Sequence, residues 1–209
     1  GADDTIPNIP YFILNGVSLM VEEDFDINFG AWGQGIASDN ATTGNWLVDV
    51  PVPSYGTPGT PSTICQPGSQ TTPGGTMCAI TGNAPTSTAG LGTNDVDAGI
   101  TTLESPIYNL STYTNPILTY QRWWSNNSGA NPGQDYWITQ ISNDGGATWV
   151  PIEATQVSDK SWRRFAYRVT DYVPLSSTVQ MRFMTSDSLI TGAYLNGGSL
   201  VEAAVDDYY

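Results

Sequence analysis

Alternation of apolar and polar positions is clearest in the second half of the chain. Every second residue is apolar in 165–169 and again in 179–183, and a period of two predicts strands with one face in a core. Apolar runs bounded by turn residues predict three more strands, at 116–124, 136–142 and 147–152. Little of the chain has a helical period. The short spacing between turn signals favours an antiparallel sandwich over a parallel sheet.

The first half of the chain is less regular. Residues 1–20 contain two prolines and predict an approach segment or linker, with one edge strand at 11–14. Residues 51–76 are rich in Pro, Gly, Ser and Thr, and predict a long irregular loop. Because 209 residues can bury a sizeable core, we expect a single domain over 21–209, an all-β, two-sheet antiparallel β-sandwich with long loops and little helix.

The period of two also assigns arginines to the sheet face opposite the core. Arg164 and Arg168 alternate with the apolar residues of one predicted strand, and Arg182 alternates with those of the next. Together with Arg122 and Trp124 they predict a ligand-binding face, because arginine and aromatic groups suit sugar hydroxyls or uronate carboxylates. The alternative is a solvated arginine face, with the tryptophan belonging to core and loop.

Residues 142–149 match the S-x-D-x-G-x-T-W pattern of an Asp-box turn. In such a turn the aspartate accepts hydrogen bonds from backbone amides, the glycines permit a positive φ, and the tryptophan packs under the turn. The motif is informative about structure and nearly silent about function. Its pattern residues are Ser142, Asp144, Gly146, Thr148 and Trp149.

The charge balance excludes several function classes. The chain has twenty Asp and Glu, six Lys and Arg, a net charge of −14 and no histidine. The missing histidine removes the usual zinc ligand, general base and partner of a serine or cysteine nucleophile, so metallopeptidase chemistry is excluded within this chain. The negative charge argues against nucleic acid and anionic membranes as partners. No apolar run approaches the roughly 18–20 residues of a membrane-spanning helix, so we expect no membrane insertion.

Two acids, Asp95 and Asp97, lie among glycine and asparagine in 92–99. Hard oxygen ligands on a tight turn suit calcium better than acid–base chemistry. The alternative for Asn94, Asp95 and Asp97 is a polar turn in which the aspartates accept hydrogen bonds from their own backbone.

The two cysteines, Cys65 and Cys78, lie on either side of a loop rich in Gly, Pro and Thr. In an exported protein they would pair, and closing a loop of this length contributes on the order of 3 kcal/mol. The alternative is a pair of free thiols.

Several segments resemble MAM-type jelly rolls. Residues 23–26 (Glu-Asp-Phe-Asp), with Gly30 and Trp32 downstream, resemble the opening of these domains, and 201–208 resembles their closing strand. The chain is more similar still to the MAM-like jelly-roll modules attached C-terminally to secreted bacterial peptidases, zinc carboxypeptidases among them. The segments that carry this resemblance, in order from about residue 21 to 209, are 41–46, 92–110, 122–127, 141–150 and the final strand.

The resemblance implies a jelly roll of concanavalin-like architecture, in which the first and last strands are neighbours and a cation lies near their meeting point. Calcium is the expected ion, with sodium as the alternative. An acidic edge strand and a solvated chain end are the competing explanations of the same acids. The positions that match the family's ligands are Asp26, Asn94, Asp95, Asp97, Glu202, Asp206 and Asp207.

These features predict a non-catalytic, calcium-stabilised accessory module of a larger secreted or cell-surface bacterial protein. Its expected partners are a peptidase catalytic domain of the same polypeptide and a polysaccharide or protein surface. One alternative is a carbohydrate-active enzyme or lectin-like domain, because Asp24 and Asp26, or Asp95 and Asp97, are spaced to face the same way on a strand. A structural adhesin module is the other alternative.

Overall fold

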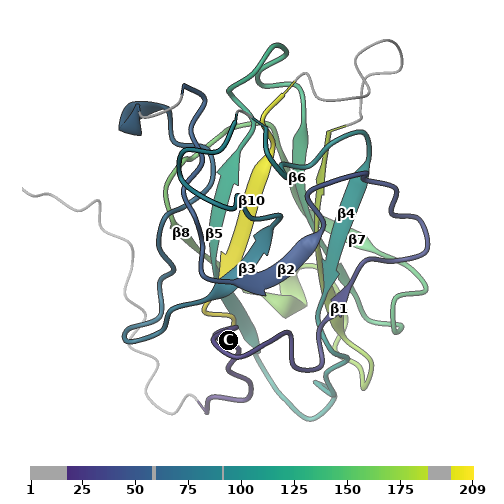
Figure 1. Cartoon of the computed structure of the whole chain (residues 1–209). Coiled ribbons are helices and arrows are strands. Elements are labelled where there is room, and N and C mark those ends of the chain that lie inside the picture. The colour runs from purple at the N-terminus through teal and green to yellow at the C-terminus, as the bar shows by residue number, and fades with distance from the viewer. Residues whose placement is uncertain (1–17, 58–59, 91, 188–198) are drawn as a thin grey trace, which may run out of the picture.

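The computed structural model describes residues 18–57, 60–90, 92–187 and 199–209, which form two facing five-stranded antiparallel sheets (Figure 1). The first sheet has the order β1 (Gly33–Gln34), β4 (Ile100–Glu104), β9 (Gln180–Ser186), β6 (Tyr136–Ser142) and β7 (Val150–Thr155). The second has the order β2 (Trp46–Asp49), β3 (Cys78–Thr81), β10 (Glu202–Asp206), β5 (Ile117–Ser125) and β8 (Arg163–Arg168). The predicted all-β sandwich is therefore confirmed.

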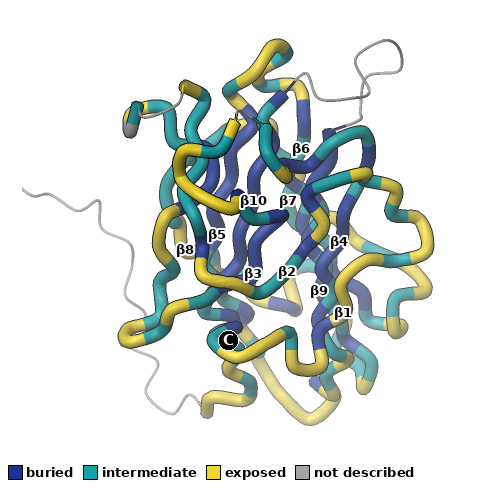
Figure 2. Tube along the Cα trace, viewed as in Figure 1, coloured by how far each residue is buried: buried dark blue, intermediate teal, exposed yellow. Residues whose placement is uncertain are grey.

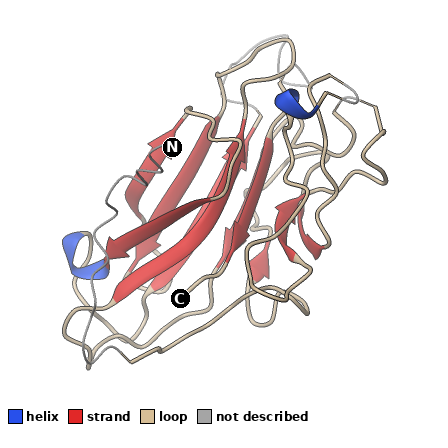
Figure 3. Cartoon of the chain, turned by 90° about the vertical axis from the view of Figure 1, so that its left-hand side faces the viewer, coloured by secondary structure: helices blue, strands red, loops and turns tan. Residues whose placement is uncertain are grey.

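In the described ranges, helix is confined to two short 3₁₀ turns at the margins of the molecule, at Pro61–Thr63 and Val169–Asp171 (Figure 3). The second turn explains why Val169 does not continue the predicted alternation: the chain leaves β8 at Arg168. β7 begins later than predicted because 147–149 belongs to the preceding turn. The edge strand predicted at 11–14 lies outside the described residues.

The core between the sheets is built on aromatic rings. Phe183 of β9 lies 4.6 Å from Tyr120 of β5, measured between ring centroids, so one contact joins the two sheets. The same phenylalanine stacks on Trp137 at 5.6 Å and on Trp32 at 6.1 Å. All four side chains are buried, and the strands form the dark interior of Figure 2.

The second sheet is also buried on its outer face. We call the described residues 51–57 and 60–77 the covering loop, because this largely irregular segment lies over that face. Its backbone accepts hydrogen bonds from two indole groups, Trp123 Nε1 to Cys65 O at 2.6 Å and Trp162 Nε1 to Ser69 O at 2.8 Å. A second, smaller core forms beneath it, consisting of Cys78, Ile80, Trp123 and Ala204, with Leu47, Ile64 and Trp162 packed against them.

Coverage on both sides leaves all five residues of β10 buried, as are all four of its neighbour β3. Figure 1 shows it in yellow between β3 and β5. Immediately after it, Tyr208 exchanges two backbone hydrogen bonds of 2.9 Å with Glu23. The segments expected to be first and last in the sandwich are therefore neighbours.

The predicted disulfide is not formed: Cys65 and Cys78 are both free and buried. Trp123 explains the separation. Its ring packs with Cys78 in the smaller core, while its N–H bonds to the carbonyl of Cys65, so the indole is shared between the two cysteines. Spacing along the chain was compatible with a pair but did not reveal this intervening side chain.

Arg122 lies between the two sheets and not on the predicted outer face. It is 3% exposed, and its guanidinium contacts Glu153 of the opposite sheet and Asp159, each at 2.6 Å. The group also lies 4.1 Å from the ring centroid of Phe165. Along β5 it shares its side with Tyr120 and Trp124, both fully buried, and so it faces inward.

We expect both thiols to react with Ellman's reagent only after unfolding. Protein prepared without reductant should show close to no reactive thiol when folded and about two in denaturant, because both side chains are buried. A denatured sample that yields no thiol until it is reduced would establish the disulfide instead.

Replacing Arg122 with Ala should lower the free energy of unfolding by about 3 kcal/mol, because the change leaves two carboxylates without their partner in a partly dry site. The matched control is Arg168→Ala, which removes an exposed arginine whose contact with Asp171 is 3.8 Å long. Denaturant unfolding measures both. A loss for Arg122→Ala no larger than that of the control would contradict this role.

Candidate functional site

The predicted arginine face does not exist as one surface. Trp124 is fully buried in the main core, and Arg122 is buried between the sheets. Arg164 and Arg168 are exposed on β8 of the second sheet, whereas Arg182 is on β9 of the first. The prediction was wrong because the alternation along a strand shows only which residues of that strand share a side. It does not show to which of the two sheets the strand belongs.

Arg182 instead belongs to the outer face of the first sheet, where register places it beside Glu104 and Gln140. Its Nε donates to Gln140 Oε1 at 2.7 Å, and one of its terminal nitrogens lies 4.0 Å from Glu104. Its guanidinium lies 4.1 Å from the ring centroid of Trp149. Burial lowers the pKa of Arg182, while the carboxylates of Glu104 and Asp39 oppose that shift.

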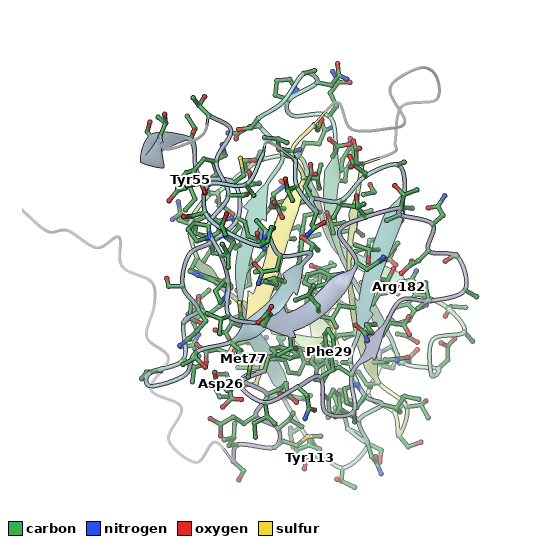
Figure 4. The ribbon with its side chains drawn as sticks, viewed as in Figure 1. Asp26, Phe29, Tyr55, Met77, Tyr113 and Arg182 are labelled. Atoms are coloured by element: carbon green, nitrogen blue, oxygen red, sulfur yellow. The ribbon has the colours of Figure 1, made fainter. Side chains whose placement is uncertain are left out.

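An apolar row runs beside this polar row. Ile138 of β6 is paired with Met184 of β9, and Tyr136 lies one step along the same side of β6. All three side chains are half-buried. We call the two rows together the open face; its residues are Glu104, Tyr136, Ile138, Gln140, Trp149, Arg182 and Met184. In Figure 4 Arg182 lies at the right, and Tyr55 of the covering loop at the upper left.

The Asp-box turn brings Trp149 to the open face. Asp144 accepts hydrogen bonds from the amide and hydroxyl of Thr148 at 2.8 and 2.6 Å and from the hydroxyl of Ser142 at 2.7 Å. These bonds lower the pKa of Asp144 to about 2, the Thr148 hydroxyl being the main cause. Gly146 has a φ of +86°, and a Cβ there would lie 3.3 Å from the Trp149 ring. The glycine therefore permits the tryptophan to pack against the turn.

The seven predicted cation ligands fall into separate groups. Glu202 and Asp206 are at the two ends of β10, four residues apart, so their α-carbons are about 13 Å apart on an extended strand. Asn94 is also apart: its side chain is exposed and donates to the carbonyl of Asn83 at 2.8 Å. Within the ranges that the structure describes, no three Asp, Glu or Cys side chains converge to hold a metal ion. A single site made of all seven residues is therefore ruled out.

One group, at the end of β10, binds the covering loop. Asp206 accepts hydrogen bonds from the amide and hydroxyl of Thr71 at 2.7 and 2.9 Å, and Asp207 accepts one from the Thr72 hydroxyl at 2.8 Å. Asp26 accepts from the amides of Thr76 and Met77 at 2.5 and 2.8 Å, and Figure 4 shows it next to Met77. The covering loop has no strand partner for these backbone amides. The carboxylate oxygens accept hydrogen bonds from them and from the threonine hydroxyls, and so satisfy donors that a neighbouring strand would otherwise satisfy.

The other group consists of Asp95, Asp97 and Glu202, which interact electrostatically at the beginning of β10. Asp95 is 1% exposed and Glu202 3%. Burial, followed by repulsion from Asp97, raises the pKa of Asp95 to about 8, although the nearby Val201 amide opposes both. Burial and repulsion from Asp95 raise the pKa of Glu202 well above its usual range.

Two further acids of this neighbourhood were not predicted from the sequence. Asp135 precedes β6 and Asp187 follows β9, and each interacts electrostatically with the group: Asp187 with Asp95, and Asp135 with Asp187. In the sequence, each of these acids directly adjoins an apolar strand. Because β6 and β9 pair antiparallel, the start of β6 and the end of β9 lie at the same edge of the sheet, which brings Asp135 and Asp187 together. That pairing was not deducible from one sequence.

Asp206 should impose a pH dependence on stability. Its pKa is raised to about 6 in the folded protein, mainly by burial, while an unfolded aspartate titrates near 3.9. Its stabilising contribution is therefore full below about pH 4 and is lost as the pH rises through about 6.

Asp206→Asn should flatten the dependence of the melting temperature on pH between about pH 4 and 7. The reason is that the substitution removes a group that binds up to one more proton in the folded state than in the unfolded state. Asp171→Asn, at an exposed position, is the control. Equal slopes for Asp206→Asn and the unmodified protein would contradict the assignment.

No family model matches the chain, and no curated protein matches it. Among solved structures, the K1 cleaved adhesin domain of Lys-gingipain from Porphyromonas gingivalis W83 is similar at 14% identity, with a TM-score of 0.50, covering 90% of this chain and 95% of that one. At this identity the likeness is one of fold alone.

The described part of the chain contains no helix long and apolar enough to cross a membrane.

Carbohydrate-binding modules also occur among the similar structures. One, a module whose mannan recognition has been characterised, is 10% identical with a TM-score of 0.45, covering 91% of this chain and 95% of that one. The C-terminal family 22 module of Clostridium thermocellum Xyn10B is 10% identical with a TM-score of 0.44, covering 90% of each chain. These scores are too low to support any inference about function. The comparison that bears on the fold of this chain is therefore the one with the adhesin domain.

Proposed function

We propose that this protein is a non-catalytic binding module that recognises a neutral polysaccharide through the open face of the first sheet. The observation that carries the proposal is the row formed by Arg182, Gln140 and Trp149, with a half-buried apolar row beside it. The second sheet offers less of its own surface, because the covering loop packs on its outer face.

The chemistry of the open face suits a sugar chain. Sugar rings combine an apolar C–H face with a rim of hydroxyls, and Tyr136 and Trp149 supply aromatic groups that have an apolar body and a polar edge. Arg182 and Gln140 supply planar donors and acceptors, and their mutual hydrogen bond of 2.7 Å orients both before a ligand arrives. Both rows belong to paired strands and a well-bonded turn, so binding would order few side chains.

Charge favours a neutral polymer over a polyanion. Arg182 is next to Glu104 at 4.0 Å and also interacts with Asp39, so the only arginine of the open face is already offset by two acids. The chain as a whole has a net charge of −14. A uronate polymer would meet repulsion on approach, whereas neutral hydroxyls would not.

The acids near the open face do not form a hydrolytic pair. Glycoside hydrolysis generally needs two carboxyl groups at a set separation across the scissile bond. Asp39 is occupied by hydrogen bonds from the amide and hydroxyl of Thr102, both at 2.7 Å. Glu104 is therefore left without a second carboxylate available for proton transfer, which supports binding without catalysis.

The wider setting is also a proposal. The resemblance to MAM-like modules of secreted bacterial peptidases supports a chain that serves a catalytic domain of the same polypeptide outside the cell. In that setting the open face would keep the catalytic domain near a polysaccharide surface.

Affinity electrophoresis through gels containing soluble xylan, mannan, galactan or β-glucan tests the proposal. We expect retardation by at least one polymer, and about tenfold weaker binding for Arg182→Ala and for Trp149→Phe, because each substitution removes part of the arginine–indole pair. The matched control is Arg168→Ala, which removes an arginine from the other sheet and should leave retardation unchanged. Mobility unaffected by all four polymers, or equal weakening by all three variants, would refute the open face as the binding site.

A further inference from the structure

Positive charge is concentrated at one edge of the second sheet. Four of the six basic residues of the chain lie within 160–168, a stretch without Asp or Glu, although the protein has a net charge of −14. Three of the four belong to β8, the last strand of that sheet, which lies at its left-hand edge in Figure 1. The most basic segment of the chain is therefore an edge strand. Its basic residues are Lys160, Arg163, Arg164 and Arg168.

The outer edge of β8 presents unpaired backbone groups. β8 pairs with β5 on one side, and in the described ranges no strand pairs with its other side. The amide of Val169 bonds to the carbonyl of Pro116, which continues the same register, and hydrogen-bonded pairs alternate along an antiparallel ladder. The backbone groups of Phe165 and Tyr167 therefore point to β5. The backbone groups that point away from β5, toward a position where a further strand could pair, belong to Arg164, Ala166 and Arg168.

The same three residues have exposed side chains on the outer face of the sheet. Phe165 and Tyr167, which alternate with them, pack against the main core on the inner face. The two outer arginines are four residues apart, so their α-carbons are about 13 Å apart on an extended strand. Ala166 between them is small and leaves the row open. One edge thus combines unpaired backbone groups with two guanidinium groups at a defined spacing.

These guanidinium groups are weakly engaged within the protein. Among the ion pairs of the described residues, none includes Arg164, and Arg168 lies 3.8 Å from Asp171 with both side chains exposed. Arg163 lies 3.5 Å from Asp159. Exposed pairs at such distances contribute little, because water and salt screen them. The arginines are therefore available to carboxylates of another molecule, which accept two parallel hydrogen bonds from a guanidinium.

Protection of the edge is the competing explanation of these charges. Charged side chains commonly prevent an edge strand from pairing, and lysine is used most for this purpose. β8 instead has three arginines and no lysine, and the planar guanidinium matches a carboxylate in a way that the ammonium group does not. The row also discriminates between strands: a second β8 would place arginine opposite arginine, whereas an acidic strand would pair with it. The composition favours recognition of an acidic strand.

We propose that the free edge of β8 binds an extended acidic segment of a partner protein, which adds to the second sheet as a further antiparallel strand. Backbone hydrogen bonds would provide affinity, and two carboxylates four residues apart, opposite Arg164 and Arg168, would provide specificity. Acids elsewhere on the protein oppose this binding little at physiological salt, where charges more than about 8 Å away are screened. The edge is separate from the open face, so this proposal does not depend on polysaccharide binding.

A nuclear magnetic resonance titration with short peptides tests the edge. The probe is a capped seven-residue peptide of Thr and Val with Glu at its second and sixth positions, which share one side of an extended chain. We expect saturable shifts of the amide signals of Arg164, Ala166 and Arg168, and weaker binding as NaCl is raised. The matched control is the isomer with Glu at the second and fifth positions. It should bind about fivefold more weakly, because its acids face opposite sides.

Methylation of the peptide backbone separates strand addition from attraction of charge alone. Methylating the fourth amide, which faces β8 opposite Ala166, should weaken binding about tenfold because it removes a ladder hydrogen bond. Methylating the third amide, which faces away from β8, should have little effect. Equal effects of the two methylations, or equal binding of the two Glu isomers, would overturn the proposal.

Substitutions on β8 complete the test. Arg164→Ala and Arg168→Ala should each weaken binding about threefold, and Arg163→Ala, which removes the same charge from the other side of the strand, should have a smaller effect. Arg164→Glu combined with Arg168→Glu should abolish binding and select the peptide with Lys in place of Glu. Two further outcomes would overturn the proposal: polygalacturonate shifting the same amides when the peptide does not, or a dimer in sedimentation that Arg164→Glu dissociates. The first would assign the edge to a polyanion, and the second to another copy of this chain.

Discussion

Burial of β10 on both faces is the constraint on which the rest of the structure depends. Its inward residues Ala203 and Val205 belong to the main core, and its outward residue Ala204 belongs to the smaller core beneath the covering loop. The same strand has Glu202 at its beginning and Asp206 at its end, so two carboxylates become buried with it. The fold has to satisfy each of them locally, because burial of an unpaired charge costs several kcal/mol.

The two ends of β10 meet this requirement differently. At Asp206 the covering loop supplies an amide and a hydroxyl from Thr71, so the acid also fixes an irregular segment that has no strand partner. At Glu202 a single hydroxyl from Ser54 is available, and the adjacent Asp95 adds charge without adding donors. The same strand thus has one buried carboxylate with several donors and another with one, and the shortage of donors helps to keep the pKa of Glu202 well above its usual range.

Much of the fold could be predicted from the sequence, and the site much less. Residues 165–169 and 179–183 alternate clearly and lie largely within β8 and β9, because a sheet with one face in the core leaves that period in its sequence. β5 is different, because the consecutive residues Trp123 and Trp124 are both buried, one in each core. The alternation of apolar and polar residues is therefore lost along this strand, and it could not show that Arg122 faces inward. The partners of Asp95 were also hidden, since Asp135 and Asp187 approach it only through strand pairing.

The asymmetry between the sheets separates stability from recognition. The second sheet has the covering loop, the smaller core and the buried acids Glu202 and Asp206, and a change there alters the free energy of unfolding. The first sheet has its outer face half-buried, with Arg182 oriented by Gln140 and Trp149, and those contacts involve neither core. The ion pair between Arg122 of β5 and Glu153 of β7 joins the two sheets on their inner faces, so this connection does not involve residues of the open face. A module built in this way can bind a ligand on one sheet while the other sheet secures the fold, which is the property that the proposed function requires.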